Sequence, residues 1–351
     1  MTFGIYKFMG LISWKKINKE NLKRASSKTS NIIARISKGN YINLESIEKI
    51  CLALECKVED LAEIYTDIWR NNNKMTNSNL TPFVKWAGGK KQLINEIEKR
   101  LPKQIKNYYE PFVGGGAILF YLKPQKAYIN DINSVLINAY NIIKTNPSQI
   151  ISLLSELDKI ECTKETYYNI RDKFNNKILS REYDVEMASL FIFLNKRCFN
   201  GLYRVNSKGL FNVPFNNKLK CDSYNKENIL NISEYLKNVN ITNLDFEESL
   251  INAKKGDFIF FDSPYAPLNP TSFDSYTKDG FDKESHIRLS KVFKRLDKKG
   301  CLLMLTNHNT KLIRDLYSEY KIEVVDVKRN INSKASNRTG KEVIITNYEY
   351  W

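Results

Sequence analysis

The chain has 351 residues, of which 42% are hydrophobic, so it can hold two or three domains with buried cores. Lys and Arg outnumber Asp and Glu by 55 to 39, and the net charge of +16 favours a polyanionic partner, although a basic enzyme without one would have the same balance. The six cysteines form no C-x-x-C pair and the two histidines are too few for a typical metal site, so we expect no metal. No stretch resembles a signal peptide or a membrane span, so we expect a cytoplasmic protein.

Residues 1–68 show helical periodicity and precede a polar, asparagine-rich linker at 69–80. Residues 11–40 hold eight basic side chains and one acid, and Gly39 and Asn43 are suited to end one helix and begin the next. The pattern predicts a helix-turn-helix with its recognition helix near residues 29–37, although a small protein-binding bundle would look alike. The stretch from Leu11 to Ile64 resembles the Cro/C1-type repressor domain.

After the linker, apolar runs alternate with helical stretches, which predicts an α/β domain. "NYYEPFVGGGAILFYL" (107–122) reads as a strand, a glycine turn and a helix. Glycines at the end of a strand let the backbone approach a ligand closely. "WAGGKK" (86–91) is no P-loop, because no Ser or Thr follows the lysine. A glycine loop without phosphate-binding residues suggests a nucleoside without phosphates, although a tight turn explains the glycines equally well.

Three further segments place acidic residues at the ends of predicted strands. "KAYIND" ends with Asp131, where doubly wound folds bind a ribose hydroxyl. "VNITNLDF" ends with Asp245 and Phe246, which suit an adenine. "FIFF" (258–261) is a continuous apolar run, typical of a covered parallel strand, and Asp262 follows it. A helix cap would explain any one of these acids, but together they indicate a ligand crevice at one sheet edge.

The segment "KRCFNGLYRVNSKGLFNVPF" (196–215) reads as a hairpin that turns near residues 206–209. Basic residues alternate in it with the aromatic residues Phe199, Tyr203 and Phe211, a pattern that suits phosphate contact and base stacking, although an ordinary surface hairpin would share it. Near the end, "KIEVVDVK" and "EVIITNYEY" read as two paired strands. The basic loop between them, residues 329–341, is expected to follow a DNA backbone.

Six motifs now carry a resemblance to one family. "TPFVKWAGGK", "YYEPFVGGGAILF", "INDIN", "FNGLYRVNSKGLFNVPF", "LDF" and "DFIFFDSPYAP" occur in the order seen in DNA adenine N6-methyltransferases of the Dam class (D12, or alpha). The resemblance runs from Thr81 to the end. It implies a seven-stranded, S-adenosylmethionine-dependent methyltransferase sheet over 81–351, with a target-recognition insertion at about 138–238, preceded by the small all-α helix-turn-helix domain.

The resemblance also assigns roles to individual residues. Residues on the side of the S-adenosylmethionine cofactor are Trp86, Gly88, Lys90, Phe112, Gly114, Gly116, Asp131, Asp245, Phe246 and Asp262. Residues expected to contact DNA are Lys85, Arg197, Phe199, Asn200, Leu202, Arg204, Asn206 and Pro214, with Arg204 suited to read guanine by two hydrogen bonds.

The catalytic residues implied are Asp262, Ser263, Pro264 and Tyr265. An exocyclic amine inside a base pair is out of reach, so the target adenine must leave the duplex. The Asp262 carboxylate and the Ser263 carbonyl would accept the two N6 hydrogens, and Tyr265 would stack on the base. Positioning and electrostatics then supply most of the catalysis. The family usually has proline where Ser263 stands, so φ is not locked there.

The function expected is therefore S-adenosylmethionine-dependent methylation of adenine N6 in double-stranded DNA, by resemblance in GATC and within a restriction-modification system with a possible endonuclease partner. A cytosine-N4 methyltransferase is the alternative enzyme, since the same chemistry serves both exocyclic amines. A DNA-binding regulator with a decayed methyltransferase domain is the alternative without activity, which the intact acids and glycine loop disfavour.

Overall fold

The structure is a computed structural model that describes residues 80–86, 88, 90, 93–268, 280–328 and 339–350. The predicted helix-turn-helix at 1–68 lies outside these residues, as do the predicted linker before Leu80 and most of the predicted basic loop at 329–341. The last three residues of that loop, Thr339 to Lys341, begin a strand.

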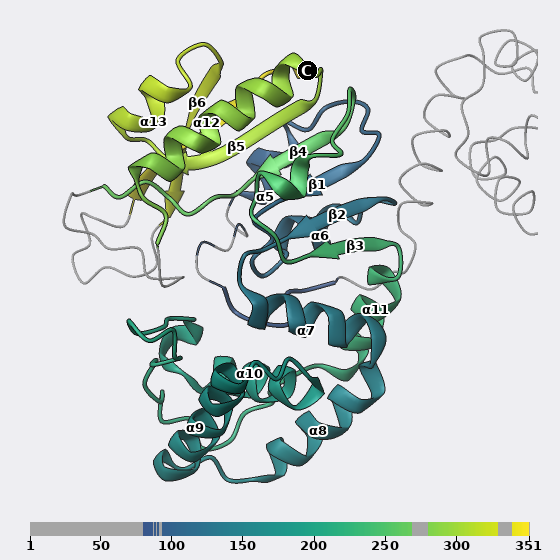
Figure 1. Cartoon of the computed structure of the whole chain (residues 1–351), viewed down its shortest axis with the longest axis vertical. Helices are drawn as coiled ribbons and strands as arrows, with labels where there is room; N and C mark the ends of the chain where they lie inside the picture. Colours follow the sequence, from purple (N-terminus) through teal and green to yellow (C-terminus); the bar gives the residue numbers. More distant parts are fainter. Residues whose placement is uncertain are drawn as a thin grey trace, which may run out of the picture. The chain divides into compact units, whose positions relative to one another are not determined.

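One seven-stranded sheet organises the described chain, as the resemblance implied (Figure 1). The order is β3-β2-β1-β4-β5-β7-β6, with the first five strands along the chain parallel and β7 antiparallel to β5 and β6. The strands are β1 Tyr108–Glu110, β2 Ala127–Asn130, β3 Val239–Thr242, β4 Phe258–Phe261, β5 Leu302–His308, β6 Lys321–Lys328 and β7 Thr339–Thr346. The chain builds outward from β1 to β3 and then returns to β4, so the strand order reverses between β1 and β4, where such sheets bind ligands.

Strand β4 is buried along its whole length, as its uninterrupted apolar sequence predicted. Its alternate side chains enter two different cores. Phe258 and Phe260 join the core that contains helices α6 (Ala117–Leu122) and α7 (Ser134–Thr145), whereas Ile259 and Phe261 join the core that contains α12 (Lys283–Lys298) and α13 (Lys311–Leu316). The remaining short helices are α5 Ile94–Glu98, η2 Phe199–Gly201 and η3 Glu248–Leu250.

Between β2 and β3 the chain inserts a helical layer, seen below the sheet in Figure 1. Its helices are α8 Pro147–Lys159, α9 Lys164–Ser180, α10 Val185–Arg197 and α11 Lys226–Leu236. Helix α10 packs against α7, α8 and α9, while α7 and α11 pack against each other and against β3. The helical insertion is therefore anchored to the sheet through α7 and α11.

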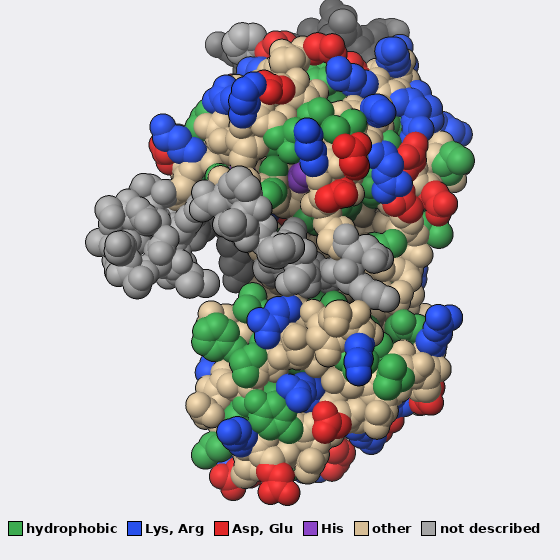
Figure 2. All heavy atoms as spheres, turned by 60° about the vertical axis from the view of Figure 1, so that its left-hand side comes forward, with side chains coloured by type: hydrophobic (Ala, Val, Ile, Leu, Met, Phe, Trp, Pro, Cys, Tyr) green, Lys and Arg blue, Asp and Glu red, His purple; other side chains and the backbone are tan. Residues whose placement is uncertain are grey.

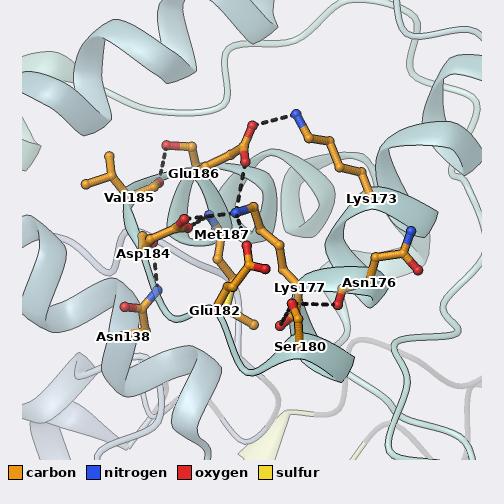
Figure 3. A network of polar contacts seen from close by, with 11 residues as sticks. Asn138, Lys173, Asn176, Lys177, Ser180, Glu182, Asp184, Val185, Glu186 and Met187 are labelled. Carbon is orange, nitrogen blue, oxygen red and sulfur yellow. Dashed lines mark hydrogen bonds and ion pairs between the residues drawn. The ribbon is translucent and has the colours of Figure 1, made fainter.

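Lys177 fastens α9 to α10 within this layer (Figure 3). Its ammonium is almost enclosed and pairs with Glu182 at 3.1 Å, Asp184 at 2.8 Å and Glu186 at 2.9 Å. Asp184 also caps α10 by accepting a hydrogen bond from the Met187 amide, and its carbonyl accepts one from the side chain of Asn138 on α7. This network fixes the helix from which the predicted recognition hairpin emerges. No helix in the described part of the chain is long and apolar enough to cross a membrane.

Candidate active site

The glycine loop follows β1 and leads directly into α6. Gly114 and Gly116 both have positive φ, +49° and +71°, which favours glycine. A Cβ on Gly114 would lie 2.7 Å from the Trp86 indole, and one on Gly116 would lie 2.5 Å from the Tyr140 hydroxyl oxygen. The Tyr140 hydroxyl donates a hydrogen bond to the Gly114 carbonyl at 3.0 Å. The loop therefore requires glycine both for its backbone and for its close packing.

Asp131 at the end of β2 holds this loop. Its carboxylate accepts hydrogen bonds from the amides of Gly114 at 3.0 Å and Asn133 at 2.9 Å. Burial raises the pKa of Asp131 to about 6, although both backbone amides favour the charged form. Asp131, the residue predicted to bind the ribose, thus lies at the glycine loop, and each of its carboxylate oxygens retains acceptor capacity for a hydroxyl.

Asn130, which the sequence reasoning missed, joins three strand ends. Its side-chain amide donates to the carbonyls of Pro111 and Leu244, and its oxygen accepts from the Leu244 amide and the Thr242 hydroxyl. The side chain is buried and fully hydrogen-bonded, so it aligns the segments after β1, β2 and β3. Its position directly before Asp131 in "INDIN" was the signal that could have revealed it.

Three aromatic rings gather beside these strand ends. Phe112 and Phe246, both predicted, lie 5.3 Å apart between ring centroids, and Phe281 completes the group at 5.8 and 6.2 Å from them. The Arg288 guanidinium lies over the Phe246 ring at 4.3 Å and donates to the Asp245 carboxylate at 2.6 Å. Phe281 lies two residues before α12 and Arg288 lies within it, and no pattern in the sequence connected them to "LDF".

Asp262 lies at the end of β4, beside the point where the strand order reverses. Its Oδ1 is 2.6 Å from the Lys90 ammonium and accepts a hydrogen bond from the Thr306 hydroxyl at 3.0 Å. Lys90 also donates to the Gly88 carbonyl at 2.6 Å and lies 4.6 Å from the centroid of the Tyr265 ring. Burial raises the pKa of Asp262, while Lys90 and Thr306 stabilise its charged form. The structure therefore joins the predicted residues Lys90, Asp262 and Tyr265.

Strand β5 holds the segment that follows Asp262. The Asn307 side chain accepts a hydrogen bond from the Ala266 amide at 2.8 Å and donates to the Ser263 hydroxyl at 3.4 Å. His308 Nδ1 lies 2.8 Å from the Ala266 carbonyl oxygen. The serine hydroxyl is thus used to fix the backbone at the position where the family usually has a proline ring. Pro264 lies between these contacts, half-buried.

A second buried acid, Glu110, ends β1 and was not predicted. It accepts a hydrogen bond from the Tyr108 hydroxyl at 2.8 Å. Burial holds the pKa of Glu110 well above its usual range, and the negative charge of Asp262 adds to this effect. The neutral form of Glu110 is therefore favoured, so the Lys90 charge is balanced mainly by Asp262.

The predicted hairpin is present and turns where the sequence placed it. Val205 and Phe211 form an antiparallel bridge, and the Asn206 side chain accepts hydrogen bonds from the amides of Lys208 and Leu210. Asn206 therefore shapes the turn. Arg204 is exposed, with its Nε donating to Asn212 at 2.8 Å.

The remaining predicted DNA contacts divide by exposure. Phe199 is 53% exposed, and its amide donates to the carbonyl of the exposed Pro214 at 2.8 Å. Asn200 is exposed with φ of +54°, whereas Leu202 is partly buried against the core. The other hairpin rings, Tyr203 and Phe211, are buried; Tyr203 stacks on Trp86 at 5.3 Å, so these two rings cannot stack on DNA bases.

The segment that contains Lys85 is tied to this hairpin. The Asn195 side chain accepts from the Lys85 amide at 2.8 Å and donates to the carbonyls of Lys85 and Gly201, each at 3.0 Å. The exposed Lys85 side chain packs so closely on Gly201 that a Cβ there would meet it at 2.5 Å. Lys85 thus lies beside Gly201 of η2, the turn that begins with the exposed Phe199.

The prediction that Arg197 contacts DNA is wrong. Its side chain is 1% exposed and pairs with Asp158 at 3.0 Å, while also donating to the Cys221 carbonyl and the Ser223 hydroxyl. Its guanidinium lies 3.8 Å from the Phe193 ring centroid. Arg197 ends the buried helix α10, and its place in that apolar helix, rather than its charge, decides where its side chain lies.

On the face shown in Figure 2, charge alone does not mark a path for DNA. In Figure 2, Lys and Arg side chains are scattered over the upper and lower parts of the visible face, with acidic and apolar side chains among them. The candidate interface therefore depends on the particular exposed residues around η2 and the hairpin.

Comparisons with known proteins give two family matches. The family of D12 class N6 adenine-specific DNA methyltransferases matches residues 86–331, and the Cro/C1-type helix-turn-helix DNA-binding domain matches residues 10–67. The second match bears out the helix-turn-helix expected from the sequence.

Similar curated proteins include two type II methyltransferases. M1.LlaDCHI of Lactococcus lactis subsp. cremoris is 44% identical over 275 residues, covering 77% of this chain and 96% of the relative. M.MjaIII of Methanocaldococcus jannaschii is 44% identical over 288 residues, covering 76% and 99%. The DNA adenine methylase of Escherichia coli K12 is 32% identical over 270 residues, covering 76% and 95%.

Proposed function

We propose that this chain, which belongs to the D12 class of N6 adenine-specific DNA methyltransferases, methylates a flipped-out adenine in the sequence GATC. The observation that carries the proposal is the charged pair of Lys90 and Asp262 at the end of β4, next to Tyr265. Family membership makes adenine the base, in preference to cytosine N4. The complete set of strand-end acids and glycines supports an active enzyme rather than a decayed one.

S-adenosylmethionine is the methyl donor of the family, and its sulfonium supplies an activated methyl group. The chain offers it a glycine loop with no room for a side chain, the Asp131 carboxylate for a ribose, and the rings of Phe112 and Phe246 for an adenine. These groups lie around the carboxyl ends of β1, β2 and β3. The residues thus fit a nucleoside that carries no phosphate.

The reaction requires an amine nitrogen whose lone pair is freed from the adenine ring. Asp262 accepts one N6 hydrogen and the Ser263 carbonyl accepts the other, which favours a tetrahedral nitrogen. S-adenosylmethionine would supply the methyl group to N6, and Asp262 would take up the N6 proton that is then lost and pass it to solvent. Lys90 keeps Asp262 charged before the base arrives, and Tyr265 stacks on the base.

DNA recognition is proposed to use the exposed residues around the hairpin. Lys85, Phe199 and Asn200 lie at η2, and Arg204 lies on the hairpin, where it would read guanine. The helix-turn-helix at residues 10–67 is proposed as a second DNA contact, for example with an operator. A restriction endonuclease of the same specificity is the proposed partner, since the relatives include type II methyltransferases.

The test uses duplexes that differ at one position. Unmethylated duplexes containing GATC, or the same sequence with one base pair changed, are incubated with protein and labelled S-adenosylmethionine, and the digested nucleosides are separated. We expect N6-methyladenine from GATC only, and none from the Asp262→Ala variant, which should still bind DNA. Methylation at another sequence would overturn the GATC assignment, and full activity of Asp262→Ala would overturn the mechanism.

A further inference from the structure

We propose that Glu342 is a positioning residue for methyl transfer, which fixes the Tyr265 side chain against the target base from the neighbouring strand β7. The inference rests on the role proposed above for Tyr265 and deepens it. Nothing in the sequence joined these two residues, because 77 positions separate them along the chain.

The register of the sheet brings Glu342 next to Tyr265. Strands β5 and β7 pair antiparallel, with His308 directly opposite Glu342. The Tyr265 hydroxyl donates a hydrogen bond to Glu342 Oε2 at 2.8 Å, and the Tyr265 ring meets the His308 ring edge-on at 4.8 Å. Two adjacent strands thus hold the hydroxyl and the edge of one ring.

A tyrosine fixed in this way loses little freedom when a base stacks on it. Aromatic stacking is favourable only when the ring lies parallel to the base at contact distance, so a freely rotating ring would have to be ordered during each turnover. A hydrogen bond to a charged acceptor is stronger than one between neutral groups, which suits a carboxylate for this task. Glu342 therefore prepares the ring before the base arrives.

Glu342 also acts on Asp262 through its charge. Burial is the largest effect that raises the pKa of Asp262, and the Glu342 carboxylate raises it further, against Lys90 and Thr306. Glu110 and Tyr108 on β1 also interact electrostatically with the Asp262 carboxylate, and the His308 ring contacts the Tyr265 ring. The titratable and charged groups packed around the Asp262 carboxylate are Lys90, Tyr108, Glu110, Tyr265, His308 and Glu342.

The experiment compares Glu342→Ala, Glu342→Gln, Tyr265→Phe and the double variant Glu342→Ala/Tyr265→Phe. The control is Glu323→Gln, the same chemical change on neighbouring strand β6, where Glu323 pairs with Arg100. Measurements are kcat and KM for an adenine duplex across pH 5 to 8, the Kd for S-adenosylmethionine, and the fluorescence of 2-aminopurine placed at the target adenine. Thermal unfolding of each variant is measured as well, to show whether the variant is folded.

Glu342→Ala and Tyr265→Phe should each lower kcat about tenfold with unchanged cofactor Kd, since each removes the same charged hydrogen bond. The double variant should lose no more than either single one. Glu342→Gln keeps an acceptor for the hydroxyl but removes the charge, so the pKa of Asp262 falls. Because the ionised carboxylate is the active form, the acid limb of the kcat profile should then move to lower pH. Glu323→Gln should match the wild type.

The inference would be overturned if the double variant lost kcat by the product of the two single losses. It would also be overturned if Glu342→Gln left the acid limb unshifted and Glu342→Ala kept the wild-type kcat. If Glu342→Ala fails to fold, a wild-type kcat in Tyr265→Phe together with an unshifted acid limb in Glu342→Gln would overturn the inference. Methyl transfer by the wild type without any rise in 2-aminopurine fluorescence would remove base flipping from the proposed function, while the kcat comparison would still judge Glu342.

Discussion

The two buried carboxylates Asp262 and Asp131 differ in the groups that stabilise their negative charge. A charge removed from water must be paired or hydrogen-bonded, and otherwise the group becomes neutral. Asp262 has a lysine ammonium at 2.6 Å, whereas Asp131 has only two backbone amides. The first arrangement stabilises the charged form that catalysis uses, against the effect of burial. The second leaves Asp131 close to its point of protonation.

Cofactor binding should therefore depend on pH. The pKa of Asp131 is raised to about 6, and only the ionised carboxylate can accept hydrogen bonds from both backbone amides and a ribose hydroxyl. We expect the affinity for S-adenosylmethionine to be constant near pH 7 and to fall as the pH drops through about 6. Calorimetric titrations between pH 5 and 7 measure this. Asp131→Asn should bind weakly throughout this range, and a flat profile in the wild type would contradict the prediction.

Arg197 and Arg204 allow a matched comparison of a buried and an exposed arginine. Arg197→Ala removes the buried partner of the half-buried Asp158 and should lower the free energy of unfolding by about 3–5 kcal/mol. Arg204→Ala should leave thermal unfolding unchanged and reduce discrimination against a changed guanine by about 1–3 kcal/mol. Competitive methylation of cognate and altered duplexes measures the second effect. A parallel loss on both duplexes would make Arg204 a phosphate contact instead.

At the scale of elements, the glycine loop, α6 and α7 form one unit around a close backbone approach. The Tyr140 hydroxyl of α7 donates a hydrogen bond to the loop at Gly114, and its oxygen lies 2.5 Å from the position that a Cβ of Gly116 would take. Helix α7, which leads from the sheet into the insertion, therefore also shapes the cofactor loop.

Gly116→Ala should abolish cofactor binding and lower stability, because it adds both a left-handed strain of about 1–2 kcal/mol and a clash at 2.5 Å. Adding Tyr140→Phe removes the hydroxyl and should restore part of the stability. Gly209→Ala is the matched control, since its φ is +77° with no atom within 4 Å, so it carries the strain alone. Melting temperatures measure the change in stability of each variant, and cofactor Kd values measure the change in binding. Equal effects at the two glycines would show that the clash is relieved.

At the scale of the whole molecule, the methyltransferase relatives account for only part of the chain. Three of them align over 76–77% of this chain yet over at least 95% of their own lengths. The D12 match begins at residue 86, whereas the helix-turn-helix match ends at residue 67. The catalytic unit is therefore expected to be complete without the first quarter of the chain.

A protein that begins at Met75 should fold and methylate DNA at the rate of the full chain. The first 74 residues hold 13 Lys and Arg against eight Asp and Glu, so their loss removes five positive charges. Nonspecific DNA affinity should weaken and depend less on salt, because fewer counterions are released. Salt titrations and footprinting of both forms measure this. Equal salt slopes and footprints would show that the amino-terminal domain does not bind DNA, and lost methylation would place it in the catalytic unit.

Local sequence patterns by themselves determined much of the fold and of the candidate site. The apolar run before Asp262 predicted a strand covered on both faces, and the glycines and acids at strand ends predicted a ligand crevice, because parallel strands end at one edge of a sheet. The six ordered motifs indicated the family and thus the reaction. These features depend on residues close together in the chain, which is why they could be read without a structure.

Tertiary structure alone decided which distant side chains meet. Arg197 looked like a DNA contact until α10 placed it inside the helical insertion, and Glu342 joined Tyr265 only through the register of β5 and β7. Phe281, two residues before α12, packs against Phe112. Such contacts arise when strands and helices pack, and local periodicity fixes which face of an element is buried but not which residue of another element lies opposite it.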